Sequence, residues 1–353
     1  MGAPRFTLGT TAGSAAALTM VIVAAPAHAA ASSYVALGDS YSSGVGTRSY
    51  INDGTSCQRS VYAYPSLIAS ARGYTLSFRA CSGATVADVT NTQLSALSAS
   101  TSYVTMSVGG NDAGFSSVLT ECAQPGWMSN CNGAIDNAQS FINTTLPSRL
   151  ATLYASIRSK APNAKVVIAG YPRIFNGEDC NAGTWFSPAE ESRLNYTSDL
   201  MNGKLSTAAA NAGFTFASVT TPFVGHAVCD NPEWLNGLSS PVSESYHPNK
   251  TGQSSGYTPV VSPKLTGVPL AVTPAMQSRA AASEPRLADQ ARRYAAADAQ
   301  VTPKPFVAPD LTSTRARAAA MAAGVDLSSR ASVDAADRRY DAMQNPSSPH
   351  PSR

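Results

Sequence analysis

Hydrophobic and polar positions alternate along residues 31–261 in a way that predicts strands separated by helices. Apolar runs typical of buried strands lie at 34–37, 74–80, 103–108, 166–169 and 214–219. Stretches with helical spacing lie at 62–71, 134–160, 188–211 and 249–261. Pro147 is expected to break or kink the second of these helices. The alternation predicts an α/β fold, a three-layer αβα sandwich with a central, mainly parallel sheet of about five strands.

Glycine and polar residues follow three of the predicted strands directly. These groups are Gly38-Asp39-Ser40, Cys81-Ser82-Gly83 and Gly109-Gly110-Asn111-Asp112. In open parallel sheets, ligands bind beyond the carboxyl ends of the strands. We therefore expect the three groups to share one site.

The first 29 residues have the pattern of a secretory signal peptide. Arg5 supplies a positive charge, the apolar run 15–25 is too short to span a bilayer, and Ala27-His28-Ala29 fits a cleavage site. An N-terminal membrane anchor is the alternative. The protein is therefore expected to be secreted, with a mature chain that begins near Ala30.

Six cysteines follow the predicted signal peptide: Cys57, Cys81, Cys122, Cys131, Cys180 and Cys229. An even number in an exported chain predicts disulfides, and six cysteines allow 15 connectivities. Pairing neighbours in sequence order would close three local loops and is the expectation from order alone. No C-x-x-C motif and no histidine–carboxylate cluster with ligand spacing occurs, so we expect no metal and no cofactor.

The composition changes after residue 264. Residues 265–353 are rich in Ala, Pro, Ser and Arg, and the segments 287–299 and 314–323 have helical spacing with mostly alanine on their apolar faces. Such a segment buries too little apolar surface to offset the entropy lost on ordering. The expected organisation is a folded domain at 30–264 and a flexible tail at 265–353, with a small helical accessory module as the alternative to the tail.

Ser40 and His247 are candidates for a nucleophile and its base. The four histidines of the chain are His28, His226, His247 and His350. Two of these lie in the predicted signal and tail, and His226 lies in a loop where a structural role is expected. His247 precedes Pro248 at the start of a predicted helix. A neutral imidazole there is suited to accept the serine proton.

Gly83 and Asn111 are candidates for stabilising negative charge. Acyl transfer places charge on the carbonyl oxygen, and fixed N–H donors directed at that oxygen lower the barrier. A glycine backbone N–H and an asparagine side-chain amide at strand ends are suitable donors. The aromatic and sulfur-containing side chains that are candidates for an acyl groove are Trp127, Met128, Trp185 and Phe186.

Four blocks in this order resemble the SGNH hydrolase family, also called GDSL esterases and lipases. They begin at Gly38, Cys81, Gly109 and Tyr246, and the resemblance extends from Ser33 to about Val261. It implies that Ser40 is the nucleophile, that His247 is the base, and that an oxyanion hole is formed by Ser40 N–H, Gly83 N–H and the Asn111 side chain. The cysteine pattern resembles the secreted actinobacterial lipases of the family, whose three disulfides pair sequentially.

Glu244 marks a departure from the family pattern. Many members have an aspartate three residues before the histidine, where this chain has Glu244. Either its carboxylate orients His247 as the third member of a triad, or its main-chain carbonyl does so and leaves a Ser–His dyad. The secreted actinobacterial branch resembles the second arrangement, which we favour.

The resemblance implies a secreted serine ester hydrolase, a lipase or esterase that cleaves carboxylic esters, with acyl lipids as the expected substrates. A phospholipase, a thioesterase and a polysaccharide deacetylase are alternatives with the same site. A secreted binding protein without catalysis is disfavoured, because all four blocks are intact. With 13% charged residues and a net charge of +3, the chain has no footprint for nucleic acid. The expected partners are an ester or lipid substrate and, transiently, a lipid surface, and the chain is expected to be a monomer.

Overall fold

The computed structural model describes residues 1–9 and 31–344 of the chain. It divides into two units, Met1–Ala30 and Ala31–Arg353. In the first unit, residues 1–9 are exposed and have no regular structure, and most of the predicted signal peptide lies outside the described residues. No helix in the described part of the chain is long and apolar enough to cross a membrane.

The second unit is built on one sheet of five parallel strands. In spatial order the strands are β2 (Thr75–Phe78), β1 (Ser33–Gly38), β3 (Tyr103–Ser107), β4 (Lys165–Ala169) and β5 (Thr215–Ala217). In β1, Tyr34 pairs with Leu76 on one side and with Tyr103 on the other. The strands are mostly buried, as expected for a parallel sheet covered on both faces. The prediction of about five mainly parallel strands is confirmed.

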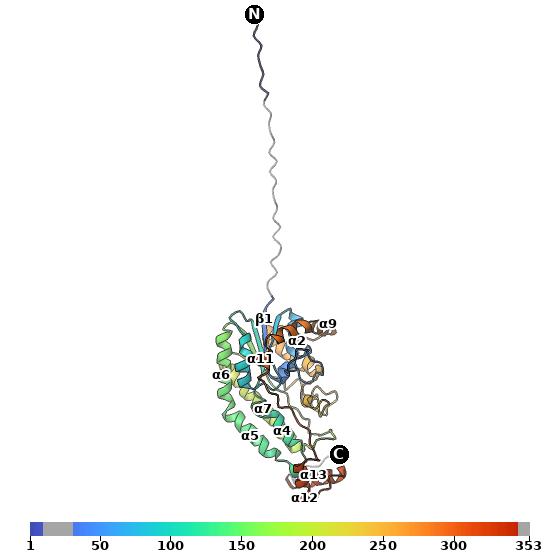
Figure 1. Cartoon of the computed structure of the whole chain (residues 1–353). Coiled ribbons are helices and arrows are strands. Elements are labelled where there is room, and N and C mark those ends of the chain that lie inside the picture. Colours follow the sequence, from blue (N-terminus) through green and yellow to red (C-terminus); the bar gives the residue numbers. More distant parts are fainter. Residues whose placement is uncertain (10–30, 345–353) are drawn as a thin grey trace. The chain divides into compact units, whose positions relative to one another are not determined.

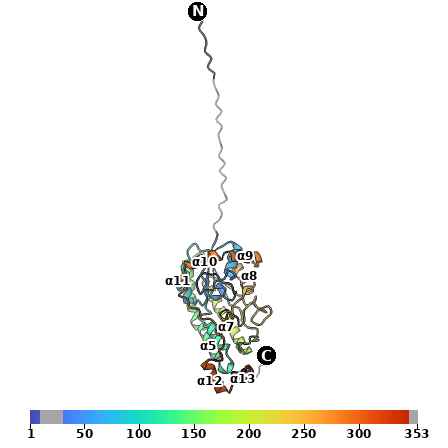
Figure 2. The same ribbon diagram turned by 45° about the vertical axis from the view of Figure 1, so that its right-hand side comes forward.

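Helices cover both faces of the sheet (Figure 1 and Figure 2). Up to the end of the sheet domain they are α1 (Ser40–Ser43), α2 (Tyr64–Arg72), α3 (Val86–Asp88), α4 (Phe115–Cys122), α5 (Cys131–Thr144), α6 (Leu146–Lys160), α7 (Pro188–Asn211) and α8 (Thr258–Thr266). On one face, α2 packs on β2 and on α8, and α8 packs on β4 and β5. On the other face, α7 packs on β4 and β5 and contacts α5 and α6. The architecture is the predicted three-layer sandwich.

Local sequence signals set the helix boundaries. The predicted helix 134–160 is two helices, because α5 ends at Thr144 and α6 begins at Leu146 with Pro147 in its first turn. The long helix α7 begins at Pro188, and Ser187 caps it in a reciprocal pair of hydrogen bonds with Glu190. These boundaries are therefore explained by proline and capping chemistry.

Three disulfides join neighbouring cysteines in sequence order. They are Cys57–Cys81, Cys122–Cys131 and Cys180–Cys229. This is the predicted sequential pairing. The first disulfide connects the loop after α1 to the residues that follow β2, which belong to one of the predicted catalytic blocks.

The C-terminal segment differs from its prediction as a flexible tail. Helix α8 crosses the predicted boundary at 264, and the following helices are α9 (Pro274–Ala282), α10 (Glu284–Arg292), α11 (Ala295–Asp298), α12 (Thr314–Ala323) and α13 (Arg330–Gln344). Residues 267–344, here called the C-terminal extension, are not a separate module, because they belong to the same compact unit as the sheet. Leu287, Ala288 and Phe306 of the extension are buried against the domain, which supplies the apolar surface that the extension itself lacks.

Candidate active site

A glycine turn at the end of β1 positions the predicted nucleophile. Gly38 has φ +116°, and a Cβ at this position would lie 2.3 Å from the Ser107 carbonyl oxygen on neighbouring β3. Only glycine fits such a close approach of two strands with positive φ. The chain then enters α1, with Asp39 as the N-cap and Ser40 as the first helical residue. Ser40 therefore lies at the carboxyl end of the sheet.

The Asp39 carboxylate stabilises the turn between β1 and α1 through three hydrogen bonds. Its Oδ1 accepts hydrogen bonds from the Tyr41 N–H at 3.0 Å and the Ser107 hydroxyl at 2.6 Å, and its Oδ2 accepts one from the Tyr171 hydroxyl at 2.5 Å. Burial raises the pKa of Asp39, while these hydrogen bonds act in the opposite direction. Asp39 thereby joins the nucleophile turn to β3 and to the loop after β4. Sequence reasoning missed this role, because Ser107 and Tyr171 belong to no motif.

Ser40 and His247 are in hydrogen-bond contact. His247 Nε2 lies 2.9 Å from Ser40 Oγ, and His247 Nδ1 lies 2.9 Å from the Ser245 carbonyl oxygen. A carbonyl only accepts, so Nδ1 carries the proton and Nε2 offers its lone pair to the serine hydroxyl. Burial lowers the pKa of His247 to about 4, against a smaller opposing effect of the Ser245 hydrogen bond. The imidazole is therefore neutral at neutral pH and able to accept a proton.

Glu244 does not orient His247, by either of the two predicted routes. The Tyr50 hydroxyl donates to the Glu244 carboxylate at 2.6 Å, and Arg48 Nε lies 3.5 Å from it. The carbonyl that faces the histidine ring belongs to Ser245, the next residue. The physical reason is the backbone at Tyr246, whose φ of +62° turns the chain so that the preceding carbonyl points back at the ring. The arrangement is a Ser–His pair with an orienting backbone carbonyl, and the orienting residue was misassigned.

Gly83 and Asn111 lie at the same edge of the sheet as Ser40. The Cys81 N–H donates to the Gly38 carbonyl at 2.9 Å, which places the Gly83 block beside the nucleophile turn. Asn111 follows β3, and its Nδ2 donates to the Ala84 carbonyl at 3.0 Å. An amide nitrogen has two hydrogens, so a second N–H of Asn111 is left for a ligand. The three predicted blocks therefore meet as expected.

Two cavities beside this edge share Phe115 as a lining residue. A narrow apolar cavity of about 50 Å³ lies among α4, α5 and α7 and is bordered by Tyr41 and Gly110. A wider, more polar cavity of about 280 Å³ is bordered by Gly83 and Asn111. The four predicted groove residues border neither cavity: Trp127, Met128, Trp185 and Phe186. Three of them are buried, and the fourth is half-buried.

Other candidate groups lie outside this arrangement. His226 stacks on Trp234 with ring centroids 3.7 Å apart, and its Nδ1 lies 2.8 Å from the Pro232 carbonyl. This agrees with the structural role expected for it. In the described part of the chain, one group has the spacing of metal ligands, but two of its three members are the disulfide-bonded Cys180 and Cys229. Disulfide sulfurs carry no thiolate for a metal.

Comparison with known proteins identifies the class of molecule that this fold and this serine–histidine arrangement define. Residues 36–254 match the model of the GDSL-like lipase/acylhydrolase family. "Lipase 1" of Streptomyces coelicolor is 45% identical over 250 residues, which cover 70% of this chain and 92% of that protein. A lipase of Streptomyces rimosus is 44% identical over 233 residues, which cover 65% of this chain and 86% of that protein.

Two solved structures are also similar to this chain. The extracellular lipase of Streptomyces rimosus superposes with a TM-score of 0.62 at 43% identity and covers 65% of this chain and 98% of its own. Phospholipase A1 of Streptomyces albidoflavus superposes with a TM-score of 0.63 at 43% identity, with 67% and 100% coverage. The molecule is thus a carboxylic ester hydrolase of the SGNH type. It belongs to the GDSL-like lipase/acylhydrolase family.

Proposed function

We propose that Ser40 is the nucleophile and His247 the general base of this lipase or esterase. The observation that carries the proposal is the 2.9 Å contact between His247 Nε2 and Ser40 Oγ, made by a neutral imidazole whose other nitrogen is held by Ser245. This is the geometry that a base-activated serine requires. Both side chains are less than 10% exposed, so little water competes with a bound substrate.

The reaction follows from this geometry. Ser40 Oγ bonds to the ester carbonyl carbon while His247 Nε2 takes the hydroxyl proton, which gives a tetrahedral oxyanion. The C–O bond to the alcohol then breaks, and His247 returns the proton to the departing oxygen. Water, deprotonated by the same imidazole, attacks the acyl-enzyme and releases the acid and free Ser40.

The oxyanion is assigned to three donors, namely Ser40 N–H, Gly83 N–H and the Asn111 side chain. Ser40 opens a helix, and the first N–H groups of a helix have no partner within it. Gly83 and Asn111 converge on the same edge through their contacts with neighbouring residues. Donors that are already fixed cost no reorganisation when charge develops.

Acyl lipids are the proposed substrates. The cavity beside Tyr41 is lined almost entirely by apolar side chains, which suits an acyl chain. The relatives' names point the same way, and the 43% identical phospholipase A1 makes phospholipid a second candidate.

Three disulfides and a relative described as extracellular support secretion. We propose a monomer that contacts a lipid surface transiently.

The test is hydrolysis of p-nitrophenyl butyrate by the wild type and by Ser40→Ala and His247→Ala. Each substitution should lower kcat by about 10⁶-fold, the scale seen when the serine or the histidine of a serine protease triad is removed. His226→Ala is the matched control, because this imidazole is hydrogen-bonded to a loop carbonyl away from Ser40, and it should keep wild-type kcat. Substantial activity in folded Ser40→Ala enzyme would contradict the assignment. Comparing trioleoylglycerol with phosphatidylcholine vesicles then separates the two lipid substrates.

A further inference from the structure

The C-terminal extension lies beyond the residues that match the family model. The family match ends at residue 254, and the lipase of Streptomyces rimosus leaves about a third of this chain without a counterpart although 98% of its own length is covered. Among the described helices, α9 packs on α2, α10 packs on β2, and α12 and α13 pack on the turn Gly126–Met128 between α4 and α5 (Figure 1). The extension therefore contacts the domain at two separate places, and its chain passes between them.

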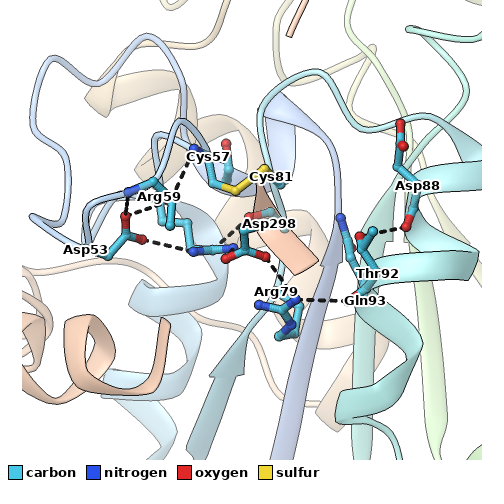
Figure 3. Close-up of a disulfide and its surroundings, with 12 residues drawn as sticks. Asp53, Cys57, Arg59, Arg79, Cys81, Asp88, Thr92, Gln93 and Asp298 are labelled. Atoms are coloured by element: carbon cyan, nitrogen blue, oxygen red, sulfur yellow. Dashed lines mark hydrogen bonds and ion pairs between the residues drawn. A yellow bond between two sulfur atoms is a disulfide. The ribbon is translucent and has the colours of Figure 1, made fainter. Parts of the chain in front are cut away.

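A buried carboxylate fastens the first end of the extension. Asp298 lies 2.6 Å from Arg59 and 2.9 Å from Arg79, and all three side chains are about 1% exposed or less (Figure 3). The ring of Tyr294, also from the extension, lies 3.8 Å from the Arg79 guanidinium carbon. Asp53 is the second acidic partner of Arg59. Since an unpaired charge is costly in the interior, the domain depends on the extension for the second of the two carboxylates that neutralise Arg59 and Arg79.

An ion pair and hydrogen bonds hold the second end of the extension, with α12 and α13, on the domain. Arg315 forms an ion pair with Glu121 of α4 at 2.7 Å, and the Gly126 N–H donates to Asp337 at 2.8 Å. The Trp185 indole donates to Asp334 at 2.9 Å. With both ends held, the residues between them have little freedom to leave the surface.

Residues 301–308, here called the crossing segment, pass over the catalytic edge between these ends. The Pro303 Cα lies 2.5 Å from where a Cβ on Gly83 would be, so the proline rests against the predicted oxyanion glycine. Phe306 packs edge-on against Tyr246, the residue before His247, with ring centroids 4.9 Å apart. The Val307 N–H donates to Thr120 of α4 at 3.0 Å. The crossing segment thus touches the loop of Gly83, the loop of His247 and helix α4, which follows the loop of Asn111.

The crossing segment is stiff and forms one wall of the cavity beside the oxyanion groups. Pro303 and Pro305 fix two of its φ angles. Thr302 and Lys304, together with Gln300, border the cavity of about 280 Å³ opposite Gly83 and Asn111. Ligand pockets generally have about 300–1,000 Å³, so this space lies just below that range. The lining of this cavity is polar, whereas the cavity beside Tyr41 is apolar and suits the acyl chain.

We propose that the crossing segment is a specificity-determining wall that limits the size of the alcohol part of the ester. This rests on the proposed function: the acyl chain occupies the apolar cavity and the alcohol occupies the polar one. A small alcohol fits under residues 301–308 without moving them. A bulkier alcohol, such as the diacylglycerol part of a triacylglycerol, meets Thr302 and Lys304, which cannot withdraw while Asp298 and Phe306 hold the segment, and its ester is hydrolysed more slowly than that of a small alcohol.

The test keeps the acyl group constant and changes the alcohol. Ethyl butyrate and tributyrin, both below their solubility limits, are hydrolysed by wild type and by Pro303→Gly/Pro305→Gly, with kcat/KM measured by pH-stat titration. Both prolines are replaced while Asp298 and Phe306 remain, so the segment stays docked and becomes flexible. The ratio of tributyrin to ethyl butyrate should rise by at least about tenfold, the lower end of what pocket contacts discriminate.

Pro274→Gly/Pro285→Gly is the matched control. It removes two exposed prolines from the starts of α9 and α10, away from the crossing segment, and should leave the ratio unchanged. An unchanged ratio in Pro303→Gly/Pro305→Gly would overturn the size limit. Absence of Ser40-dependent hydrolysis of ethyl butyrate by wild type would instead contradict the proposed function, and the size limit with it.

A second measurement uses wild-type protein alone, should the variant fail to fold. Ser40 Oγ displaces p-nitrophenolate from p-nitrophenyl ethylphosphonate esters, forming an O–P bond while His247 takes the proton. The alkoxy group is ethyl in one reagent and cyclohexyl in the other, and each rate is divided by the reagent's rate with hydroxide. At least about tenfold slower labelling by the cyclohexyl reagent is expected. Equal corrected rates would overturn the proposal.

Discussion

The catalytic edge of the sheet and the C-terminal extension are each held by a buried aspartate, but the partners of the two aspartates differ. Asp39 accepts hydrogen bonds from neutral groups, the hydroxyls of Ser107 and Tyr171. Asp298 is paired with two buried guanidinium groups, those of Arg59 and Arg79. The first network orients a reacting group, and the second neutralises charge between two parts of the chain.

This difference predicts which measured quantity a substitution in each region should change, turnover or the free energy of unfolding. Changes at the catalytic edge remove interactions with the reacting atoms, so they should lower turnover and leave the fold intact. Changes at the junction with the extension leave charge buried without a partner, so they should lower the free energy of unfolding. The predictions below separate the two regions by which quantity changes.

Asp298→Ala should give the largest loss of stability. It leaves Arg79 buried without a carboxylate, and breaking a buried pair from one side costs about 3–5 kcal/mol. The free energy of unfolding is measured by urea titration. Asp289→Ala, on the same extension but at an exposed carboxylate, is the control and should change stability by less than about 1 kcal/mol. Equal losses in both variants would contradict the charge argument.

Asn111→Ala should lower kcat by about 10²- to 10³-fold, because removal of one oxyanion donor has this effect. The measurement is kcat for p-nitrophenyl butyrate beside urea titration of the same protein. We expect unchanged turnover in Asn143→Ala, a control at an exposed asparagine of α5 that borders neither cavity. If Asn111→Ala kept wild-type kcat, the amide would not belong to the oxyanion hole.

The acid limit of activity should lie well below the usual pKa of histidine. The reaction needs neutral His247, whose pKa is lowered by burial from 6.5 to about 4. Activity should therefore persist as the pH falls through 6.5 and disappear as it falls through about 4. The free energy of unfolding should decrease over the same interval, because the unfolded chain binds the proton first. A profile of kcat/KM from pH 3.5 to 8 checks this, and a midpoint near 6.5 would contradict the effect of burial.

Glu244→Gln should have the smallest effect on turnover. Loss of an orienting carboxylate costs about 10⁴-fold in kcat in a Ser–His–Asp triad. Here the Ser245 carbonyl orients the ring and Glu244 binds Tyr50, so kcat should stay close to the wild-type value. A fall in kcat that approaches about 10⁴-fold would instead assign the orienting role to the Glu244 carboxylate. Tyr50→Phe, which removes only the hydroxyl bonded to Glu244, is the matched control.

Much of the sheet domain was predictable from the sequence because its signals are local. Periodicity and glycine stops located the strands, Pro147 marked the break between α5 and α6, and Pro188 marked the start of α7. Parallel topology brings the strand ends together, so the sequence alone places Ser40 and Asn111 at one edge. His247 followed from the scarcity of histidines in the folded part of the chain.

Contacts between distant segments were decided only by the tertiary structure. Which carbonyl faces His247 depends on one positive φ at Tyr246, which residue spacing does not reveal. The alanine-rich extension has too little apolar surface of its own for its order to be predicted from the sequence. Its docking depends on arginines more than 200 residues earlier in the chain. Residue types and local spacing determine which chemistry a chain can perform. The burial of charges and the packing of remote segments determine how that chemistry is oriented and enclosed, because both energies depend on neighbours that only the folded chain brings together.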